Sequence, residues 1–290
     1  PDSPQSSVKW TYDANSVYRV AGTVGSSLYI SAHDGNYNFR LEALDTADGS
    51  VVDASGYVGH YRGNVHLDDN DRVQYKNETS DDVYRWNPDT NATTKLHDHT
   101  SADPVYQVRP FGGDIYIARS KALGGAVERH DPSSGSVWSD STGGSTEGLD
   151  VTTAAVYSLD STDVVRYELD GTRNWTADVG QTMNAVDAGS SQYVYVAAGY
   201  TVQQVDKSGG TVTSFSYTAA ASVNDIETGP ENYVYIDDGS SLSILDPADG
   251  SVVLQHTFSA EVADVEVESG VAYVVVGESS LKKLDIAGLP

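Results

Sequence analysis

The segment Leu44–Val52 reads LDTADGSVV, and the segment Leu245–Val253 reads LDPADGSVV. Eight of the nine positions agree, although the two segments begin 201 residues apart in a chain of 290 residues. Close repetition of a phrase at such a distance indicates a chain built from repeated units. The Asp of the phrase therefore serves as a marker for further copies.

Equivalent markers each end a strand-like run just before a turn. They are Asp45, Asn87, Asp131, Asp170, Asp206, Asp246 and Asp285. Successive markers lie 42, 44, 39, 36, 40 and 39 residues apart, which is a mean of 40. A four-stranded blade of a β-propeller, as in WD40 repeats, has a period of about 40–45 residues. The repeat therefore predicts an all-β propeller.

A second marker keeps the same period. An apolar residue, a tyrosine and a further small or apolar residue stand 11 to 16 residues before the turn. The tyrosines are Tyr29, Tyr116, Tyr157, Tyr195, Tyr235 and Tyr273, and the second unit departs with Tyr75 in VQY. Runs such as YVYVAA are too apolar for a strand that is half exposed. We expect them to be buried on both faces between neighbouring blades.

The seventh unit stops directly after its turn and lacks an outer strand. The N-terminal stretch SSVKWTYDA (residues 6–14) is similar to the outer strand GTRNWTADV (residues 171–179). We therefore predict one domain, a seven-bladed propeller of four-stranded antiparallel blades, in which the N-terminal strand completes the last blade and closes the ring. Eight blades is the alternative. The predicted units are 6–14 (closing strand), 15–56, 57–100, 101–142, 143–179, 180–219, 220–259 and 260–290.

Units of the form VYV…LD…G..VW resemble the PQQ-like and YncE-like β-propeller repeats. A resemblance to quinoprotein enzymes of the PQQ type would imply that this chain holds a quinone at the ring axis, together with Ca²⁺ and a catalytic Asp. Those enzymes are longer, usually have eight blades and often carry an adjacent cysteine pair, whereas this chain has no cysteine. The tryptophans read as packing residues, so PQQ is not expected and no cofactor is predicted.

The recurring Asp of the turn phrase is explained by turn chemistry. Pro247 suits the second position of a type I turn, and Gly250 suits the left-handed position that completes the hairpin. The Asp carboxylate can accept hydrogen bonds from the amides of the turn. The phrase is therefore predicted to be scaffold and not a ligand site.

Charge is the strongest global signal. Asp and Glu number 42 against 17 Lys and Arg, so the formal net charge is −25. Such a surface repels itself in dilute buffer, but at molar salt the Debye length falls to about 3 Å and screens the repulsion. The composition resembles that of halophilic archaea and their viruses; an ordinary acidic secreted protein is the alternative. The charge argues against a nucleic-acid or anionic-membrane partner, and no apolar run is long enough for a transmembrane segment.

Metal sites have two candidates. His97 and His99 lie two apart and would share one face of a strand, but a third ligand is not evident nearby. Asp68, Asp69 and Asp71 in LDDNDR are candidates for Ca²⁺, although the EF-hand pattern is incomplete. No Gly-x-Ser-x-Gly elbow, P-loop or HExxH motif occurs. The chain therefore offers no catalytic constellation, and we predict that it is not an enzyme.

Basic residues concentrate in the first three units. Eight of the ten arginines and six of the seven histidines precede residue 131. The same units carry irregular inserts at 33–39, 76–82 and 119–126. All three join the second and third strands of a blade, so they emerge on one face, where long loops commonly carry recognition. The predicted binding residues are His33, Tyr37, Phe39, Arg40, Lys76, Asn77, Arg119 and Lys121.

The leading hypothesis is a non-catalytic propeller that binds another macromolecule. It would be a spike, turret or tail component of a haloarchaeal virion, or an extracellular cell-surface protein of a halophile. The expected partners are a protein or surface glycan of a host envelope, or neighbouring virion proteins. The alternatives are a quinone-dependent or glycan-cleaving enzyme, and a scaffold for assembly of the cell envelope.

Overall fold

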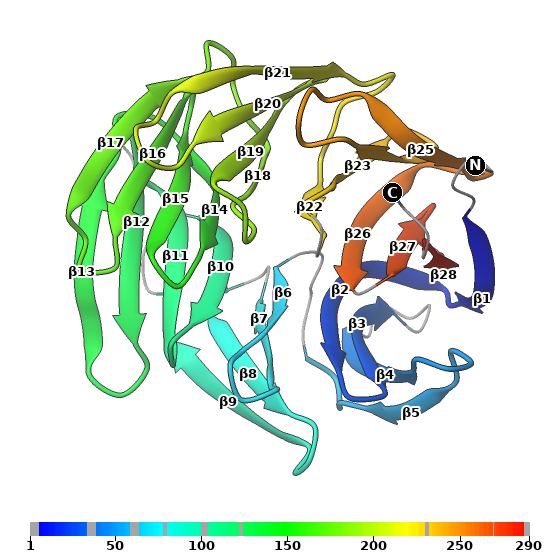
Figure 1. Cartoon of the computed structure of the whole chain (residues 1–290). Coiled ribbons are helices and arrows are strands. Elements are labelled where there is room, and N and C mark those ends of the chain that lie inside the picture. Colours follow the sequence, from blue (N-terminus) through cyan, green and yellow to red (C-terminus); the bar gives the residue numbers. More distant parts are fainter. Residues whose placement is uncertain are drawn as a thin grey trace.

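A computed structural model describes residues 6–33, 39–58, 64–77, 80–99, 104–121, 124–229, 232–268 and 270–286. Seven four-stranded antiparallel sheets are arranged as the blades of one ring, with their first strands toward its middle (Figure 1). The predicted seven-bladed, all-β fold is confirmed. Within the described ranges, no helix has the length and apolarity needed to cross a bilayer.

Each blade runs from an inner strand to an outer strand. The inner strands are β2 (Ser16–Val24), β6 (Val65–Leu67), β10 (Val105–Phe111), β14 (Thr146–Val151), β18 (Ala185–Asp187), β22 (Ile226–Thr228) and β26 (Val262–Glu268). The second strands are β3 (Ser27–His33), β7 (Val73–Lys76), β11 (Asp114–Lys121), β15 (Ala155–Asp160), β19 (Tyr193–Ala198), β23 (Val234–Asp238) and β27 (Val271–Val276). The third strands are β4 (Phe39–Asp45), β8 (Val83–Asn87), β12 (Gly124–Asp131), β16 (Asp163–Glu168), β20 (Thr201–Asp206), β24 (Ser241–Leu245) and β28 (Ser280–Asp285). The outer strands are β5 (Val51–Ala54), β9 (Ala92–His97), β13 (Gly135–Ser141), β17 (Arg173–Asp178), β21 (Val212–Thr218), β25 (Val252–Thr257) and β1 (Ser7–Asp13).

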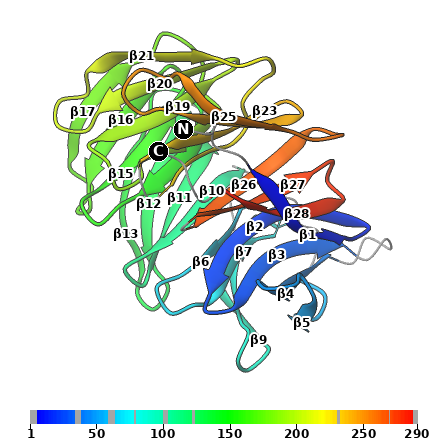
Figure 2. The same ribbon diagram turned by 45° about the vertical axis from the view of Figure 1, so that its right-hand side comes forward.

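The ring is closed by the two ends of the chain, as the sequence predicts. The first strand, β1, pairs antiparallel with the last strand, β28, in the order β1-β28-β27-β26 (Figure 2). An ion pair of 2.8 Å between Lys9 Nζ and Asp285 Oδ2 joins the two strands. Because β28 is paired on both sides, the last blade presents no open edge at this position.

The core lies between successive blades. The tyrosines of the second strands are buried, and Tyr195 has no exposed surface. Ala155, Tyr157 and Leu159 on β15 pack with Val194 and neighbouring apolar residues on β19 of the next blade. The apolar second strands are thus buried on both faces, which explains why their sequences do not alternate between polar and apolar residues.

The repeated turn segment, LDTADGSVV in the first blade, stabilises the fold in two ways. Asp45 accepts hydrogen bonds from the Ala47 amide through its carboxylate and from the Gly49 amide through its carbonyl, at 2.7 and 2.8 Å. Asp246 repeats the arrangement with Ala248 and Gly250 in the sixth blade. The predicted turn chemistry is confirmed. The second stabilising interaction is a contact with the neighbouring blade, in which an aromatic ring packs on the turn glycine.

This contact recurs around the ring. Gly49 has φ +77°, and a Cβ added to it would lie 2.8 Å from Trp10 Cε3. The Trp10 indole nitrogen also donates to the Thr46 carbonyl at 3.0 Å. Trp138 and Trp175 make the same type of contact with turn glycines of the following blades, at Gly171 and Gly210. The tryptophans on these outer strands are packing residues that join neighbouring blades.

The alternation of strand directions gives the ring two faces. The connections between second and third strands, and those from one blade to the next, emerge on one face, which we call the connection face. The turns between first and second strands, and between third and fourth strands, emerge on the other. The three inserts predicted to share a face join β3 to β4, β7 to β8 and β11 to β12, and all belong to the connection face.

Candidate functional site

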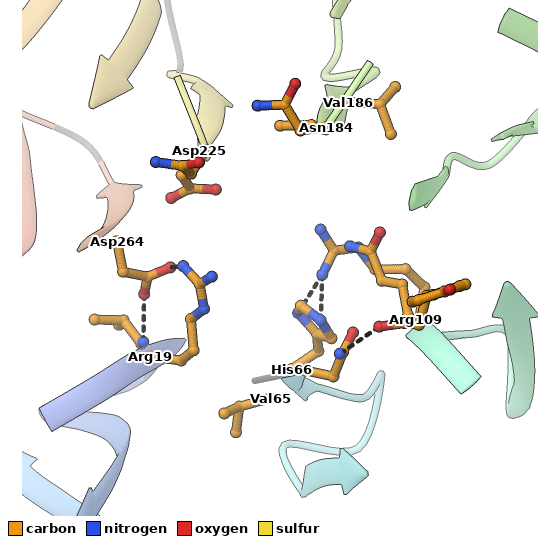
Figure 3. A pocket seen from close by; sticks show the side chains of 14 residues that line it. Arg19, Val65, His66, Arg109, Asn184, Val186, Asp225 and Asp264 are labelled. Atoms are coloured by element: carbon orange, nitrogen blue, oxygen red, sulfur yellow. Dashed lines mark hydrogen bonds and ion pairs between the residues drawn. The ribbon is translucent and has the colours of Figure 1, made fainter. Parts of the chain in front are cut away.

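A concave site lies in the channel around the ring axis. Two overlapping cavities of about 190 and 340 Å³ are lined almost wholly by the inner strands and the residues just before them. Val20, His66, Arg109, Asp225 and Asp264 line both cavities. The channel therefore brings together side chains from blades that are far apart in the sequence (Figure 3).

Charges in the channel are divided between two halves of the ring. The first three blades supply basic or imidazole side chains, and the other four supply carboxylates. The residues of the first group are Arg19, His66 and Arg109. The residues of the second group are Asp150, Asp187, Asp225, Glu227, Asp264, Glu266 and Glu268. A ligand in the channel would meet an acidic wall on one side and a cationic wall on the other.

The register of the inner strands determines which side chain of each blade faces the channel. In five blades one inner-strand residue pairs with the tyrosine of the second strand and lines the channel. These residues are Arg109, Asp150, Asp187, Glu227 and Glu266. The first blade has Gly22 opposite Tyr29, and the second, whose tyrosine is displaced, has His66 opposite Gln74. The repeat therefore places one variable residue per blade at the same level of the channel.

Several channel side chains link neighbouring inner strands. An Asp, Glu, Gln or Asn of one blade accepts a hydrogen bond from a backbone amide of the next. Such bonds run from Val108 N to Asn64, Leu149 N to Gln107, Ala188 N to Asp150, Val265 N to Asp225, Val20 N to Asp264 and Thr23 N to Glu268, at 2.6–3.2 Å. These acceptors satisfy backbone amides that no sheet hydrogen bond reaches. Their primary role is structural.

Arg19 and Asp264 join the first and last blades inside the channel. Arg19 Nη1 donates to Asp264 Oδ1 at 2.6 Å (Figure 3). It also donates to the Ala263 carbonyl at 2.8 Å. Burial is the main influence on the Asp264 carboxyl and raises its pKa. The positive charge of Arg19 opposes this rise. This ion pair lies at the ring junction that the N-terminal strand closes.

On the opposite wall Arg109 lies against His66. The Arg109 guanidinium contacts the His66 ring, and its Nε lies 3.6 Å from Asp150 Oδ1. Burial lowers the pKa of His66 well below its ordinary value, and the charges of Arg109 and Arg19 lower it further. His66 is therefore neutral at pH 7 and accepts a hydrogen bond from Arg109.

Three carboxylates of the channel differ from those that link blades. Asp187 is 9% exposed and its buried Oδ2 atom has no described hydrogen bond, but the Thr228 hydroxyl and the Gly189 amide beside the carboxylate oppose the rise in its pKa. Glu227 and Glu266 have no hydrogen-bond or ion-pair partner among the described residues. Burial, followed by repulsion from neighbouring carboxylates, raises the pKa of all three. Charged groups in this state are the ones that a ligand would stabilise.

The structure places the predicted binding residues near the connection face but ties most of them to other residues. Phe39 is buried and packs on Tyr18 with ring centroids 5.6 Å apart. His33 lies 5.0 Å from the Phe39 ring. Arg40 forms an ion pair with buried Glu42. Tyr37 lies outside the described residues.

The remaining predicted residues show the same tendency. Lys76 is buried and donates to the Val105 carbonyl at 2.8 Å and to Asp81 at 3.2 Å, which fixes the connection after β7 against the third blade. Asn77 accepts a hydrogen bond from the Ser80 amide at 3.3 Å. Arg119 forms an ion pair of 2.5 Å with Glu128. The side chain of Lys121 lies outside the described part of the structure.

The three aspartates proposed as Ca²⁺ ligands are described by the structure, and two of them already interact with other residues of the chain. Asp68 is buried and forms ion pairs with Arg72 and Arg85 at 3.0 and 2.8 Å. Asp69 accepts from the Gly112 amide at 2.5 Å, and Asp71 adopts φ +60°.

The two candidate histidines form a ring cluster with a third histidine that the sequence did not bring near them. His97 stacks edge-on against His130 with ring centroids 4.4 Å apart, and His99 lies 6.1 Å from His97. Burial and the two neighbouring rings lower the pKa of His97 to about 4. Among the described residues, no three His, Asp or Glu side chains are grouped closely enough to hold a metal ion.

Among the residues that the structure describes, the exposed aromatic side chains lie on the connection face. Tyr57, Tyr106 and Tyr200 are 62%, 39% and 58% exposed. Tyr57 follows β5, next to the Val58 amide that bonds the Phe39 carbonyl. Tyr106 begins β10 at the channel, and Tyr200 lies in the turn between β19 and β20. Other large apolar residues that are exposed in the described ranges are valines of outer strands.

The channel residues could not be selected from the sequence alone. Each stands in a short inner strand that precedes the Tyr strand, where the chain shows only isolated charged residues. The sequence feature that pointed toward the channel is the concentration of basic residues in the first three units, because three basic or imidazole residues of these units line it. They are Arg19, His66 and Arg109. What was missing was the register that aligns these positions across blades.

Comparison with known proteins reveals similar folds. No protein-family model matches the chain, and no curated protein matches it by sequence. Solved structures that resemble it include the WD40 β-propeller domain of Doa1, with TM-score 0.76, 12% identity and coverage of 98% of each chain. Virginiamycin B lyase from Staphylococcus aureus has TM-score 0.79 and 9% identity, with 97% of this chain and 99% of that chain covered. The computationally designed Ika8 protein has TM-score 0.72 and 13% identity, with 96% and 99% covered. At these identities the likeness shows the fold alone: the chain is a β-propeller repeat protein.

Proposed function

We propose that this propeller is a non-catalytic binding protein that uses its connection face to bind another protein. The observation that carries the proposal is the placement of Tyr57, Tyr106 and Tyr200, which are the exposed aromatic residues of the described ranges, on that face. Tyrosine is enriched at protein interfaces because its large, stiff ring combines apolar area with a hydroxyl that can hydrogen-bond. A rigid ring that holds such residues is suited to recognition without rearrangement.

The setting that we propose is the surface of a haloarchaeal virion or of a halophilic cell. Support comes from the net charge of −25, with 42 acidic against 17 basic residues. A carboxylate-rich surface stays compact where salt screens its repulsion. The partner would then be a protein of a host envelope or a neighbouring structural protein of the virion.

The test compares two triple variants in an envelope-binding assay. Tyr57→Ser, Tyr106→Ser and Tyr200→Ser together remove the exposed rings, whereas a control with Val52→Ser, Val137→Ser and Val252→Ser removes exposed apolar side chains from outer strands. Cosedimentation with envelopes of the host or native cell in molar salt should be lost in the tyrosine variant and retained in the control. Equal binding by the two variants would overturn the assignment of the connection face.

An enzyme is the competing function, and one observation favours it. Asp187 and Glu227 are neighbouring inner-strand carboxyls whose pKa values are raised by burial, a condition that suits general acid catalysis near neutral pH. Turnover of a panel of glycans that is lost in Asp187→Asn and Glu227→Gln would establish a glycan-cleaving enzyme in place of the binding protein. Turnover in the presence of added quinone would instead establish a quinone-dependent one.

A further inference from the structure

The aromatic ring that packs on the turn glycine of the following blade is missing at one junction. Among the described turns between third and outer strands, four glycines would bring an added Cβ within 3.4 Å of such a ring. They are Gly49, Gly171, Gly210 and Gly250, and the rings belong to Trp10, Trp138, Trp175 and Phe215. Gly135 occupies the same turn position in the third blade, but a Cβ there would meet no atom within 4 Å. The second blade therefore sends no ring to its neighbour at this place.

The strand register shows which residue stands in place of the missing ring. The three tryptophans each pair with a basic residue of the third strand, namely Lys283, Arg129 and Arg166. In the second blade the basic residue is Arg85, and its partner on β9 is Thr94. On its other side Arg85 pairs with Gln74, where those three blades have a tyrosine. The second blade thus keeps the basic residue but has lost both aromatic neighbours.

A cavity of about 390 Å³ lies beside Thr94. It is lined by Arg72, Arg85, Asn87, Thr90, Ala92 and Thr94, all from the second blade. Thr90 and Thr94 are exposed, so the cavity opens to solvent. The turns that contribute to it, between β6 and β7 and between β8 and β9, emerge on the face opposite to the connection face.

The cavity has a positive charge in a chain whose net charge is −25. Arg72 and Arg85 share one carboxylate, because Asp68 Oδ2 lies 3.0 Å from Arg72 Nη2 and 2.8 Å from Arg85 Nε. Within the described residues, one of the two arginine charges is therefore left without a counterion. The exposed Asp71 and Asp89 of the same turns do not line the cavity.

Hydrogen-bond donors remain available at the cavity. The Nη1 groups of Arg72 and Arg85 make no hydrogen bond in the described ranges, and the two side chains are 28% and 14% exposed. Asn87 stands at the marker position where the other six units have Asp. Its Oδ1 atom accepts from the Asp89 amide at 2.9 Å, which leaves its Nδ2 group as a donor. The exchange of Asp for Asn also removes a carboxylate that would repel an anion.

We propose that this cavity binds a tetrahedral oxyanion group, the chemistry that sulfate and phosphate share. The site goes beyond the proposed function, because it opens on the face opposite to the connection face. The two guanidinium groups would donate to the oxyanion and supply the charge that Asp68 leaves unbalanced, since Arg forms strong charge-assisted hydrogen bonds with such groups. The Thr90 and Thr94 hydroxyls and the Asn87 amide would add neutral donors.

The experiment is a titration of the full chain followed in NMR spectra of the arginine Nε–H groups. Sodium sulfate, sodium phosphate or galactose 6-sulfate replaces NaCl at constant ionic strength and pH 7, at the lowest salt concentration at which circular dichroism shows the protein folded. The signals of Arg72 and Arg85 are those that disappear in Arg72→Gln and Arg85→Gln. Because chloride is exchanged for the probe throughout, a general response to ionic strength is held constant.

Thr94→Trp is the decisive variant, because it places at Thr94 the side chain that three other blades have in this position. Its indole should fill the cavity and pack on Gly135. The matched control is Val252→Trp, which adds an indole to an exposed position of another outer strand. Arg173→Gln removes an arginine outside the cavity and controls for the loss of charge in Arg72→Gln.

Saturable shifts of the Arg72 and Arg85 signals are expected in the wild type, with little change at Arg173. Affinity should fall about tenfold or more in Thr94→Trp and in Arg72→Gln, and should change little in the two controls. Tighter binding of galactose 6-sulfate than of sulfate would assign the group to a sugar ester, whereas equal or weaker binding would assign the free ion. If Thr94→Trp or Arg85→Gln does not fold, Arg72→Gln decides, because its side chain is the more exposed of the two arginines.

Three results would overturn the proposal. The first is equal affinity in Thr94→Trp and Val252→Trp, or in Arg72→Gln and Arg173→Gln where Thr94→Trp does not fold. The second is a shift at Arg173 as large as those at Arg72 and Arg85, which would show binding to general surface charge. The third is the absence of saturable shifts with all three probes. None of these measurements involves the tyrosines of the connection face, so failure here is distinguishable from failure of the proposed function.

Discussion

The indole ring of Trp10 on β1 lies on Gly49 in the turn between β4 and β5, so that a Cβ at Gly49 would come within 2.8 Å of Trp10 Cε3. The two residues belong to different blades, and Trp10 belongs to the strand that closes the ring. The glycine of the turn phrase is therefore required both by the backbone, which has φ +77° there, and by the neighbouring blade.

Gly49→Ala should destabilise the protein more than Gly135→Ala does. Gly135 occupies the equivalent turn position with φ +96°, but a Cβ there would meet no atom within 4 Å. The control therefore bears only the backbone strain of a positive φ, which costs about 1–2 kcal/mol, whereas Gly49→Ala also displaces Trp10 at a further cost of about 1–3 kcal/mol. Urea unfolding at constant high salt measures the difference. Equal free energies of unfolding for the two variants would show that the indole contact contributes nothing.

Removal of the closing strand should open the ring. A chain that lacks residues 1–14 loses β1 and leaves the edge of β28 unpaired, and unpaired edges promote association between molecules. We expect dimers or aggregates in light scattering and a lower melting temperature. A synthetic peptide of residues 6–14 should restore the monomer by strand complementation. A truncated chain that remains monomeric and melts like the full chain would refute this role of β1.

The melting temperature should rise with salt. With a net charge of −25, the folded chain repels itself at low ionic strength, and molar NaCl screens that repulsion to a Debye length of about 3 Å. Differential scanning calorimetry in dilute buffer and in molar NaCl gives the measurement, with KCl as a control for ion identity. A melting temperature that does not change would contradict the proposed halophilic setting.

Stability should fall as pH rises from 6.5 to 8.5. Burial raises the pKa of Asp237 to about 7 and also raises those of Asp187, Glu227 and Glu266. A carboxyl whose pKa is higher in the folded than in the unfolded state binds its proton more tightly when folded, so its ionisation lowers the free energy of unfolding.

The window begins at pH 6.5 because the lowered pKa values of His66 and His97 act below it with the opposite sign. One pKa unit corresponds to about 1.4 kcal/mol, so the fall in melting temperature should be several degrees. A variant with Asp187→Asn, Glu227→Gln and Glu266→Gln should show a shallower slope than the wild type. The same slope in both proteins would show that these three carboxyls do not titrate in this range.

How far the sequence leads depends on how local each signal is. The turn at Asp45 and the buried strand at Tyr195 are set by neighbouring residues, so a repeat of about 40 residues predicted the blades, their strand order and the closure by the N-terminal strand. The channel depends on inner strands as short as three residues, such as β18 and β22. Their charged side chains meet only after seven blades are in register.

The insert residues illustrate a second limit. Lys76 and Arg119 stand in irregular, polar segments that are typical of recognition loops, yet Lys76 is buried against the third blade and Arg119 pairs with Glu128. A sequence shows that a long basic side chain interrupts a repeat, but it does not show whether the charge faces solvent or a carbonyl of the neighbouring blade. Conversely, the exposure of Tyr200 arises in a minimal turn that the repeat pattern makes inconspicuous.

The pairing of β1 with β28 sets the order of events during synthesis. Within the propeller β1 is synthesised before the other described strands, but its partner β28 (Ser280–Asp285) is synthesised after them. While the six intervening blades are synthesised, β1 must remain available, and the ring becomes a closed structure only after β28 has been made. A stop codon shortly before β28 would therefore leave both an unpaired first strand and an unfinished last blade, which gives quality control in the cell two exposed edges by which to recognise a truncated product.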